Sequence, residues 1–167
     1  MAQEALLALG GPAETVGRDR YGAPVWPPGF VGSLSHSGGA SAVLVARREE
    51  CAAVGLDWET VGRFDISQWP ALFTPREIET LRRVPRTSRD ALATVLFGAK
   101  EAIQKARYAA THAWSELTRL EVVLDVERKK FSVRGDETLA GHFLVNRRTA
   151  VAACWIAHRA GPPTTFA

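Results

Sequence analysis

Apolar residues recur at helical spacing through the middle of the chain and predict one long amphipathic helix from about Arg89 to Tyr108. These positions are three or four residues apart, namely Leu92, Val95, Leu96, Ala99, Ile103 and Ala106. Such spacing follows one face of an α-helix with 3.6 residues per turn. A shorter helix is predicted before it, because Thr74-Pro75-Arg76-Glu77 combines an N-cap residue, a proline at the first helical position and a glutamate three residues after the cap. We expect this helix to end near Arg83.

The flanking regions contain a short helix and several strands. Ala2–Leu9 is followed by Gly10-Gly11, which is typical of a helix with a glycine stop. Ser41–Arg47 and Cys51–Asp57 are apolar runs joined by a polar segment, and we interpret them as a β-hairpin. Further strands are expected over Leu120–Val126, Lys130–Arg134, His142–Val145 and Thr149–His158, followed by a proline-containing tail. The mixture predicts an α+β fold.

Length and composition narrow the protein class. A chain of 167 residues suits one domain, and we expect two halves at about 1–73 and 74–167 on a shared core. No apolar run approaches the roughly 18–20 residues of a membrane span, and Ala2–Leu9 has no basic leader, so we expect a cytoplasmic protein without membrane contact. Cys51 and Cys154 lie far apart, which favours core positions over a zinc site. The net charge of only +3, without interleaved stacking aromatics, disfavours nucleic-acid binding.

Two carboxylates end an apolar strand. Asp57 and Glu59 are two residues apart, so strand geometry projects them to the same side. Paired carboxylates suit a hard cation. Acidic residues also lie at strand ends simply to remain in water, so this pair alone leaves both interpretations open.

A third carboxylate lies in the predicted long helix. Phe97, Glu101 and Lys105 follow one another at intervals of four and therefore share a helical face. A surface Glu–Lys pair would show the same spacing, but the neighbouring apolar residues favour a packed position. Three carboxylates with Lys100 and Lys105 would suit magnesium and a diphosphate, because oxygen ligands hold the metal and ammonium groups neutralise phosphate charge.

A segment of small residues, Gly32–Gly39, precedes the first apolar run. Its backbone N–H groups, hydroxyls and one imidazole are suited to phosphate oxygens. It matches neither a Walker A loop nor GxGxxG, and it has no GxSxG nucleophile elbow. Taken alone, such a segment is more typical of a structural turn than of a binding site.

These segments occur together in an order that resembles one family. Trp26-Pro27 with Gly32–His36 matches WPxGxxGSxSH, Val54–Glu59 matches (I/V)G(I/V/L)DxE, and Phe97–Lys105 matches F(S/A/G)xKEAxxK. These are the patterns of the 4′-phosphopantetheinyl transferases of the surfactin and enterobactin type, and the last two together are specific. The chain resembles an N-terminally short member, because most members carry a further segment before the helix that starts here at Ala2. It would then be a trimmed form, a chain whose true start was assigned too late, or a naturally short member.

The resemblance implies two similar α/β halves related by a pseudo-twofold axis, with coenzyme A in the cleft between them. It implies transfer of the 4′-phosphopantetheine group from coenzyme A to a serine of an apo acyl or peptidyl carrier protein, releasing adenosine 3′,5′-bisphosphate. This is the activity of a holo-[acyl-carrier-protein] synthase. The alternative is a weakened homologue that binds coenzyme A or a carrier protein without transfer. We expect a monomer, since one chain supplies both halves of the cleft.

The resemblance also assigns roles by motif. Asp57, Glu59 and Glu101 would be the magnesium ligands. Glu101 would also help to deprotonate the incoming serine. The coenzyme A phosphates would be contacted by Lys100, Lys105, Ser35 and His36, with Lys105 at the diphosphate. Gly98 stands where the family usually has serine or cysteine.

Overall fold

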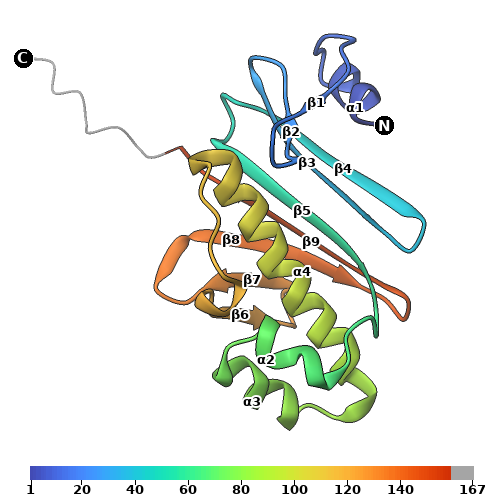
Figure 1. Cartoon of the computed structure of the whole chain (residues 1–167), viewed down its shortest axis with the longest axis vertical. Coiled ribbons are helices and arrows are strands. Elements are labelled where there is room, and N and C mark those ends of the chain that lie inside the picture. The colour runs from blue at the N-terminus through green and yellow to red at the C-terminus, as the bar shows by residue number, and fades with distance from the viewer. Residues whose placement is uncertain (159–167) are drawn as a thin grey trace, which may run out of the picture.

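One long helix, α4 (Arg86–Thr111), lies across one face of a five-stranded antiparallel sheet in the computed structural model, which describes residues 1–158 (Figure 1). The strand order is β5-β9-β8-β7-β6. The strands are β5 (Ala53–Thr60), β6 (Val122–Asp125), β7 (Lys130–Val133), β8 (Asp136–Val145) and β9 (Thr149–Ile156). The fold is therefore α+β, as expected. The expected proline-containing tail lies outside the described residues.

Helix α4 packs against the sheet through the apolar face that the sequence predicts. Ala99, Ala102, Ile103 and Ala106 are fully buried in the main core. The helix crosses β5 so closely that a Cβ atom at Gly55 would overlap the carbonyl oxygen of Ala102. The close crossing places the middle of α4 directly against the strand that carries Asp57 and Glu59.

The strand pairing differs from the predicted hairpin. Ser41–Arg47 belongs to β4 (Ala40–Arg47), which pairs with β3 (Phe30–Ser37), whereas β5 pairs with β9. Gly38 and Gly39 both have positive φ angles, which a two-residue hairpin turn of this kind requires. The prediction that Ser41–Arg47 and Cys51–Asp57 form a hairpin is therefore wrong, because Gly32–Ser37 is a strand and supplies the partner.

Strand β3 lies beside β5 (Figure 1). Side-chain hydroxyls of β3 join the two strands. The Ser33 hydroxyl accepts a hydrogen bond from the Leu56 N–H at 3.0 Å, and the Ser35 hydroxyl accepts one from the Trp58 N–H at 3.0 Å. These bonds satisfy donors on the free edge of β5. Strand β5 belongs to the expected first half of the chain, residues 1–73. It nevertheless forms the edge of a sheet whose other four strands come from the second half.

Smaller elements surround this frame. They are α1 (Ala2–Ala8), β1 (Gly17–Arg18), β2 (Pro24–Val25), the 3-10 turns η1 (Ile66–Gln68) and η2 (Leu117–Arg119), α2 (Trp69–Leu72) and α3 (Pro75–Arg83). The predicted capping of α3 is confirmed: the Thr74 hydroxyl accepts from the Glu77 N–H, and the Glu77 carboxylate accepts from the Thr74 N–H.

Within residues 1–158 there is no helix with the length and apolarity needed to cross a membrane. Cys51 and Cys154 are free and buried, as expected.

Candidate active site

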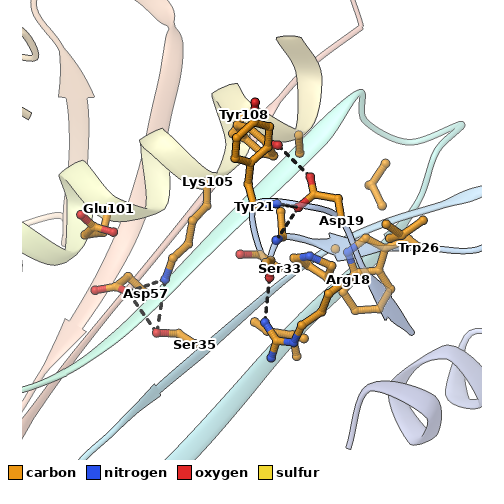
Figure 2. Close-up of a pocket in the computed structure, with 18 of the residues that line it drawn as sticks. Arg18, Asp19, Tyr21, Trp26, Ser33, Ser35, Asp57, Glu101, Lys105 and Tyr108 are labelled. Atoms are coloured by element: carbon orange, nitrogen blue, oxygen red, sulfur yellow. Dashed lines mark hydrogen bonds and ion pairs between the residues drawn. The ribbon is translucent and has the colours of Figure 1, made fainter. Parts of the chain in front are cut away.

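A pocket of about 710 Å³ opens between β3, β5 and the C-terminal half of α4 (Figure 2). It is lined by six of the seven residues singled out from the sequence, namely Ser35, His36, Asp57, Glu59, Glu101 and Lys105. Strands β3 and β5 contribute the first four and α4 the last two. The pocket is the candidate active site.

Asp57 is the centre of the polar network in this pocket. It is only 3% exposed, and its Oδ1 lies 2.6 Å from Lys105 Nζ and 3.0 Å from the Ser35 hydroxyl, which donates to it (Figure 2). Lys105 also donates to the Leu56 carbonyl at 3.1 Å. Burial raises the pKa of the Asp57 carboxyl, while the positive charge of Lys105 opposes that rise.

The second oxygen of the same carboxylate has no hydrogen-bond partner within the described part of the chain. Asp57 Oδ2 is buried and accepts no hydrogen bond from the described residues. A buried carboxylate oxygen of this kind is costly unless a donor or a cation meets it. Helix α4 passes close by, since a Cβ atom at Gly98 would lie 3.5 Å from this oxygen. The site therefore offers one unused anionic ligand beside the helix.

Glu59 is already paired. It is 6% exposed, and Arg63 Nη1 lies 2.8 Å from its Oε1 and 2.7 Å from its Oε2. The Ser37 hydroxyl donates to Oε2 at 3.0 Å. Both carboxylate oxygens thus have strong donors within the protein.

Glu101 is half-buried on the face of α4 that lines the pocket. Burial raises the pKa of its carboxyl, and the negative charges of Asp57 and Glu59 raise it further. The three carboxylates therefore interact electrostatically. Nevertheless, the structure shows no group of three His, Cys, Asp or Glu side chains within residues 1–158 that is arranged to hold a metal ion.

Lys100 does not reach the pocket, which corrects the expectation that it contacts the coenzyme A phosphates. Its side chain is 0% exposed and its Nζ lies 2.6 Å from Glu77 Oε2. The same ammonium donates to the carbonyls of Leu72 at 3.1 Å and Leu117 at 2.9 Å. Consecutive helical residues point about 100° apart, so Lys100 cannot share the face of Glu101.

The Gly32–Ser37 segment also differs from its expected role. Its backbone pairs with β4, from Gly32 with Val45 to Ser37 with Ala40, so the segment is a strand rather than a phosphate-binding turn. The hydroxyl of Ser35 is engaged by β5 and Asp57. His36 is exposed and lines the pocket, where its ring remains accessible.

The sequence patterns did not single out the aromatic end of the pocket. Tyr108 donates a hydrogen bond to Asp19 at 2.7 Å (Figure 2), which raises the pKa of Tyr108 to about 12. The Tyr108 and Trp114 rings have centroids 4.9 Å apart. Tyr108 follows Glu101 by seven residues, so helical spacing could have indicated it. Asp19 gives no such signal because its partner lies far away in the sequence.

The chain matches two family models. Residues 53–154 match the 4′-phosphopantetheinyl transferase superfamily, and residues 1–46 match the 4′-phosphopantetheinyl transferase N-terminal domain. The first match includes the segments that carry Asp57, Glu59, Glu101 and Lys105.

Three curated relatives are named 4′-phosphopantetheinyl transferases. Npt of Nocardia iowensis is 32% identical over 126 residues, 75% of this chain and 56% of the relative. Svp of Streptomyces mobaraensis is 34% identical over 137 residues, which are 80% of this chain and 54% of the relative. PptT of Mycobacterium tuberculosis is 36% identical over 115 residues, which are 68% of this chain and 49% of the relative. The chain spans about half the length of these relatives.

A solved structure shows the same fold. It is the holo-[acyl-carrier-protein] synthase of Thermotoga maritima, with a TM-score of 0.50 and 22% identity, covering 64% of this chain and 63% of the other. The family match over residues 53–154 includes both β5 and α4. The chain therefore belongs to the 4′-phosphopantetheinyl transferase superfamily.

Proposed function

We propose that this chain transfers the 4′-phosphopantetheine group from coenzyme A to a serine of an apo acyl or peptidyl carrier protein. The observation that carries the proposal is the ion pair between buried Asp57 and partly exposed Lys105, beside Glu101 in a pocket of about 710 Å³. The second carboxylate oxygen of Asp57, Oδ2, has no hydrogen-bond partner among residues 1–158. An anionic cluster next to an ammonium group suits a phosphoryl transfer, which depends mainly on positioning and charge neutralisation. The names of the curated relatives support the same reaction.

The carboxylates fit a magnesium ion. Among residues 1–158, Asp57 Oδ2 is a buried oxygen that accepts no hydrogen bond, and the carboxylates of Asp57 and Glu59 place negative charge near Glu101. A divalent cation would satisfy both Asp57 and Glu101. Asp57 and Glu101 would hold the ion. Glu59, the third expected ligand, would first have to give up hydrogen bonds from Arg63 and Ser37. When bound, magnesium would stabilise charge on the diphosphate and on the leaving bisphosphate.

Lys105 would neutralise charge on the coenzyme A diphosphate. Its side chain is 26% exposed at the pocket wall, where it pairs with Asp57. An ammonium group already oriented by Asp57 and the Leu56 carbonyl needs little reorganisation to meet a phosphate oxygen.

Glu101 would accept the proton of the incoming serine. The serine oxygen forms a bond to the phosphorus that carries pantetheine, and the bond from that phosphorus to adenosine 3′,5′-bisphosphate breaks. The serine proton passes to the Glu101 carboxylate. Glu101 lines the pocket from α4, so its carboxylate is accessible to a serine that enters there.

A second candidate is a homologue that binds coenzyme A without transferring the group. The observation in its favour is that both carboxylate oxygens of Glu59 already accept hydrogen bonds, from Arg63 and Ser37, and so are not free to bind a metal ion. Coenzyme A binding without turnover would identify this case.

Intact-mass analysis of an apo carrier protein tests the proposal. Incubation with this chain, coenzyme A and magnesium should add one phosphopantetheine, and chelation of the metal should abolish the gain. Asp57→Asn should lower the rate by about 100-fold or more, because it removes the central negative charge. A folded wild-type chain that modifies none of several acyl and peptidyl carriers would contradict the proposed transfer.

A further inference from the structure

Arg63 lies on the loop that follows β5 and lines the pocket, and the loop is anchored to α4. The N–H of Gly62 donates to the Thr94 hydroxyl at 3.4 Å. The Phe64 ring packs on Phe97, with centroids 4.3 Å apart, and the Arg63 guanidinium lies 5.4 Å from the Phe64 centroid. The residues on both sides of Arg63 are thus anchored to α4, which fixes the position of the Arg63 backbone at the pocket.

One edge of the guanidinium is held by a buried carboxylate. Arg63 Nη1 contacts both oxygens of Glu59, at 2.8 and 2.7 Å, and the Ser37 hydroxyl fixes that carboxylate from the other side. Glu59 is nearly buried, whereas the Arg63 side chain is 53% exposed. Among residues 1–158, all hydrogen bonds of this guanidinium come from Nη1. Its Nε and Nη2 donors thus remain for a ligand.

The carboxylates of the pocket repel an anionic ligand, so such a ligand needs cations that face it. Asp57, Glu59 and Glu101 bring three carboxylates to the lining. The cations that line it are Arg18, Arg48, Arg63 and Lys105, of which Arg63 pairs with Glu59 and Lys105 with Asp57. A phosphoryl group entering beside these carboxylates needs a second cation to offset repulsion. An arginine with one edge already fixed presents its fork to tetrahedral oxygens with little further loss of side-chain entropy.

We propose that Arg63 is an anion-binding residue of this pocket and that its free edge binds a phosphoryl oxygen of a diphosphate. Glu59 then acts through Arg63 as a positioning residue rather than as a metal ligand. The identification of the diphosphate with that of coenzyme A rests on the proposed function. The geometry itself requires only a ligand with phosphoryl oxygens.

Calorimetric binding of inorganic diphosphate and of coenzyme A tests the role of Arg63. Arg63→Met should weaken both affinities by about 10- to 100-fold, the usual effect of losing hydrogen bonds to a charged group. Arg63→Lys should recover only part of the affinity, because it keeps the charge but loses the planar fork. The matched control is Arg83→Met, since Arg83 and Glu79 form a pair with the same i,i+4 spacing on the exposed face of α3. This control should bind both ligands like the wild type.

A double-mutant cycle tests the role of Glu59. If Glu59 acts through Arg63, Glu59→Gln should weaken diphosphate binding in the wild type but have no further effect in the Arg63→Met background. Affinity for Mn²⁺ alone, used as a magnesium probe, should change less than tenfold on adding Glu59→Gln to Arg63→Met. A larger loss of Mn²⁺ affinity would make Glu59 a ligand and overturn its assignment as a positioning residue.

The failure of this inference is distinguishable from the failure of the proposed function. Equal diphosphate affinity in wild type and folded Arg63→Met, checked by thermal unfolding, overturns the anion-binding role even if transfer occurs. Weakened binding in Arg63→Met without any carrier modification by the wild type supports the role of Arg63 and contradicts the transfer. A wild type that binds neither inorganic diphosphate nor coenzyme A overturns both.

Discussion

Two lysines on α4 show how position on a helix decides the role of one residue type. Lys100 is completely buried against Glu77, and burial lowers the pKa of its ammonium group. Lys105 is partly exposed and pairs with Asp57 in the pocket. Five residues of helix turn the side chain by about 140°, so the two lysines cannot serve the same ligand. Lys100 ties α4 to α3, whereas Lys105 belongs to the site.

Exchange of each lysine for methionine should separate these roles. Lys100→Met should lower the free energy of unfolding by about 3 kcal/mol or more, because it leaves the buried Glu77 carboxylate without its cation. Lys105→Met should change stability less, since its side chain is partly exposed, but should weaken coenzyme A binding. Urea unfolding and calorimetry measure the two effects. If folded Lys100→Met bound coenzyme A more weakly but had unchanged stability, Lys100 would have to contact the ligand, which would contradict its structural role.

The crossing of β5 and α4 is the element-level feature that builds the site. Gly55 and Asp57 are two residues apart on β5 and therefore project to the same side, towards α4. The absence of a side chain at Gly55 lets the helix backbone approach, and Gly98 faces Asp57 at the same crossing. Two glycines thus set the separation between the Asp57 carboxylate and the helix that carries Glu101.

Gly55→Ala should disrupt this crossing. The new Cβ would overlap the Ala102 carbonyl, and because both sides are backbone, the helix must shift. We expect a loss of about 3 kcal/mol or more in unfolding free energy, at the upper end of overpacking effects, together with reduced coenzyme A affinity. Gly17→Ala is the matched control: nothing lies within 4 Å of its Cβ, and its stability should change by about 0.5 kcal/mol at most. Equal unfolding midpoints for the two variants would contradict the close crossing.

Helices were predictable from local sequence, but strand partners were not. Helical spacing and the capping box are properties of neighbouring residues, so α3 and α4 could be located. The small residues of Gly32–Ser37 resemble a turn, and only the three-dimensional arrangement shows their hydroxyls bonded to β5. The resemblance indicated the pocket residues by motif, yet it misplaced Lys100. Arg63 was not predicted as a site residue, because its place in the pocket depends on contacts that no motif encodes.

At the scale of the whole molecule, one wall of the pocket belongs to α4 and the five-stranded sheet and the other to the β3–β4 hairpin. These two parts differ in how many buried apolar residues stabilise them. The main core lies between α4 and the five-stranded sheet. The β3–β4 hairpin shares a small cluster with β5 and the segment before it, in which the buried residues are Val31, Cys51 and Val54. An isolated two-stranded hairpin is marginal in water, so this one depends on β5 and on the serine hydroxyls that join them. We infer that the hairpin side of the pocket opens more readily than the helix side.

Amide hydrogen exchange should reveal this difference. Backbone amides of β4 should exchange faster than those of β9, which lies between β5 and β8. Ser33→Ala leaves the buried Leu56 N–H without its acceptor and should speed β4 exchange about tenfold or more while leaving β9 unchanged. Ser132→Ala on β7, whose hydroxyl has no hydrogen bond among the described residues, is the matched control and should alter exchange in neither strand.

Coenzyme A should slow β4 exchange in the wild type, because a ligand bound in the pocket joins the hairpin to α4. Equal protection of β4 and β9, insensitive to Ser33→Ala, would show instead that the hairpin and the main core unfold as one cooperative unit.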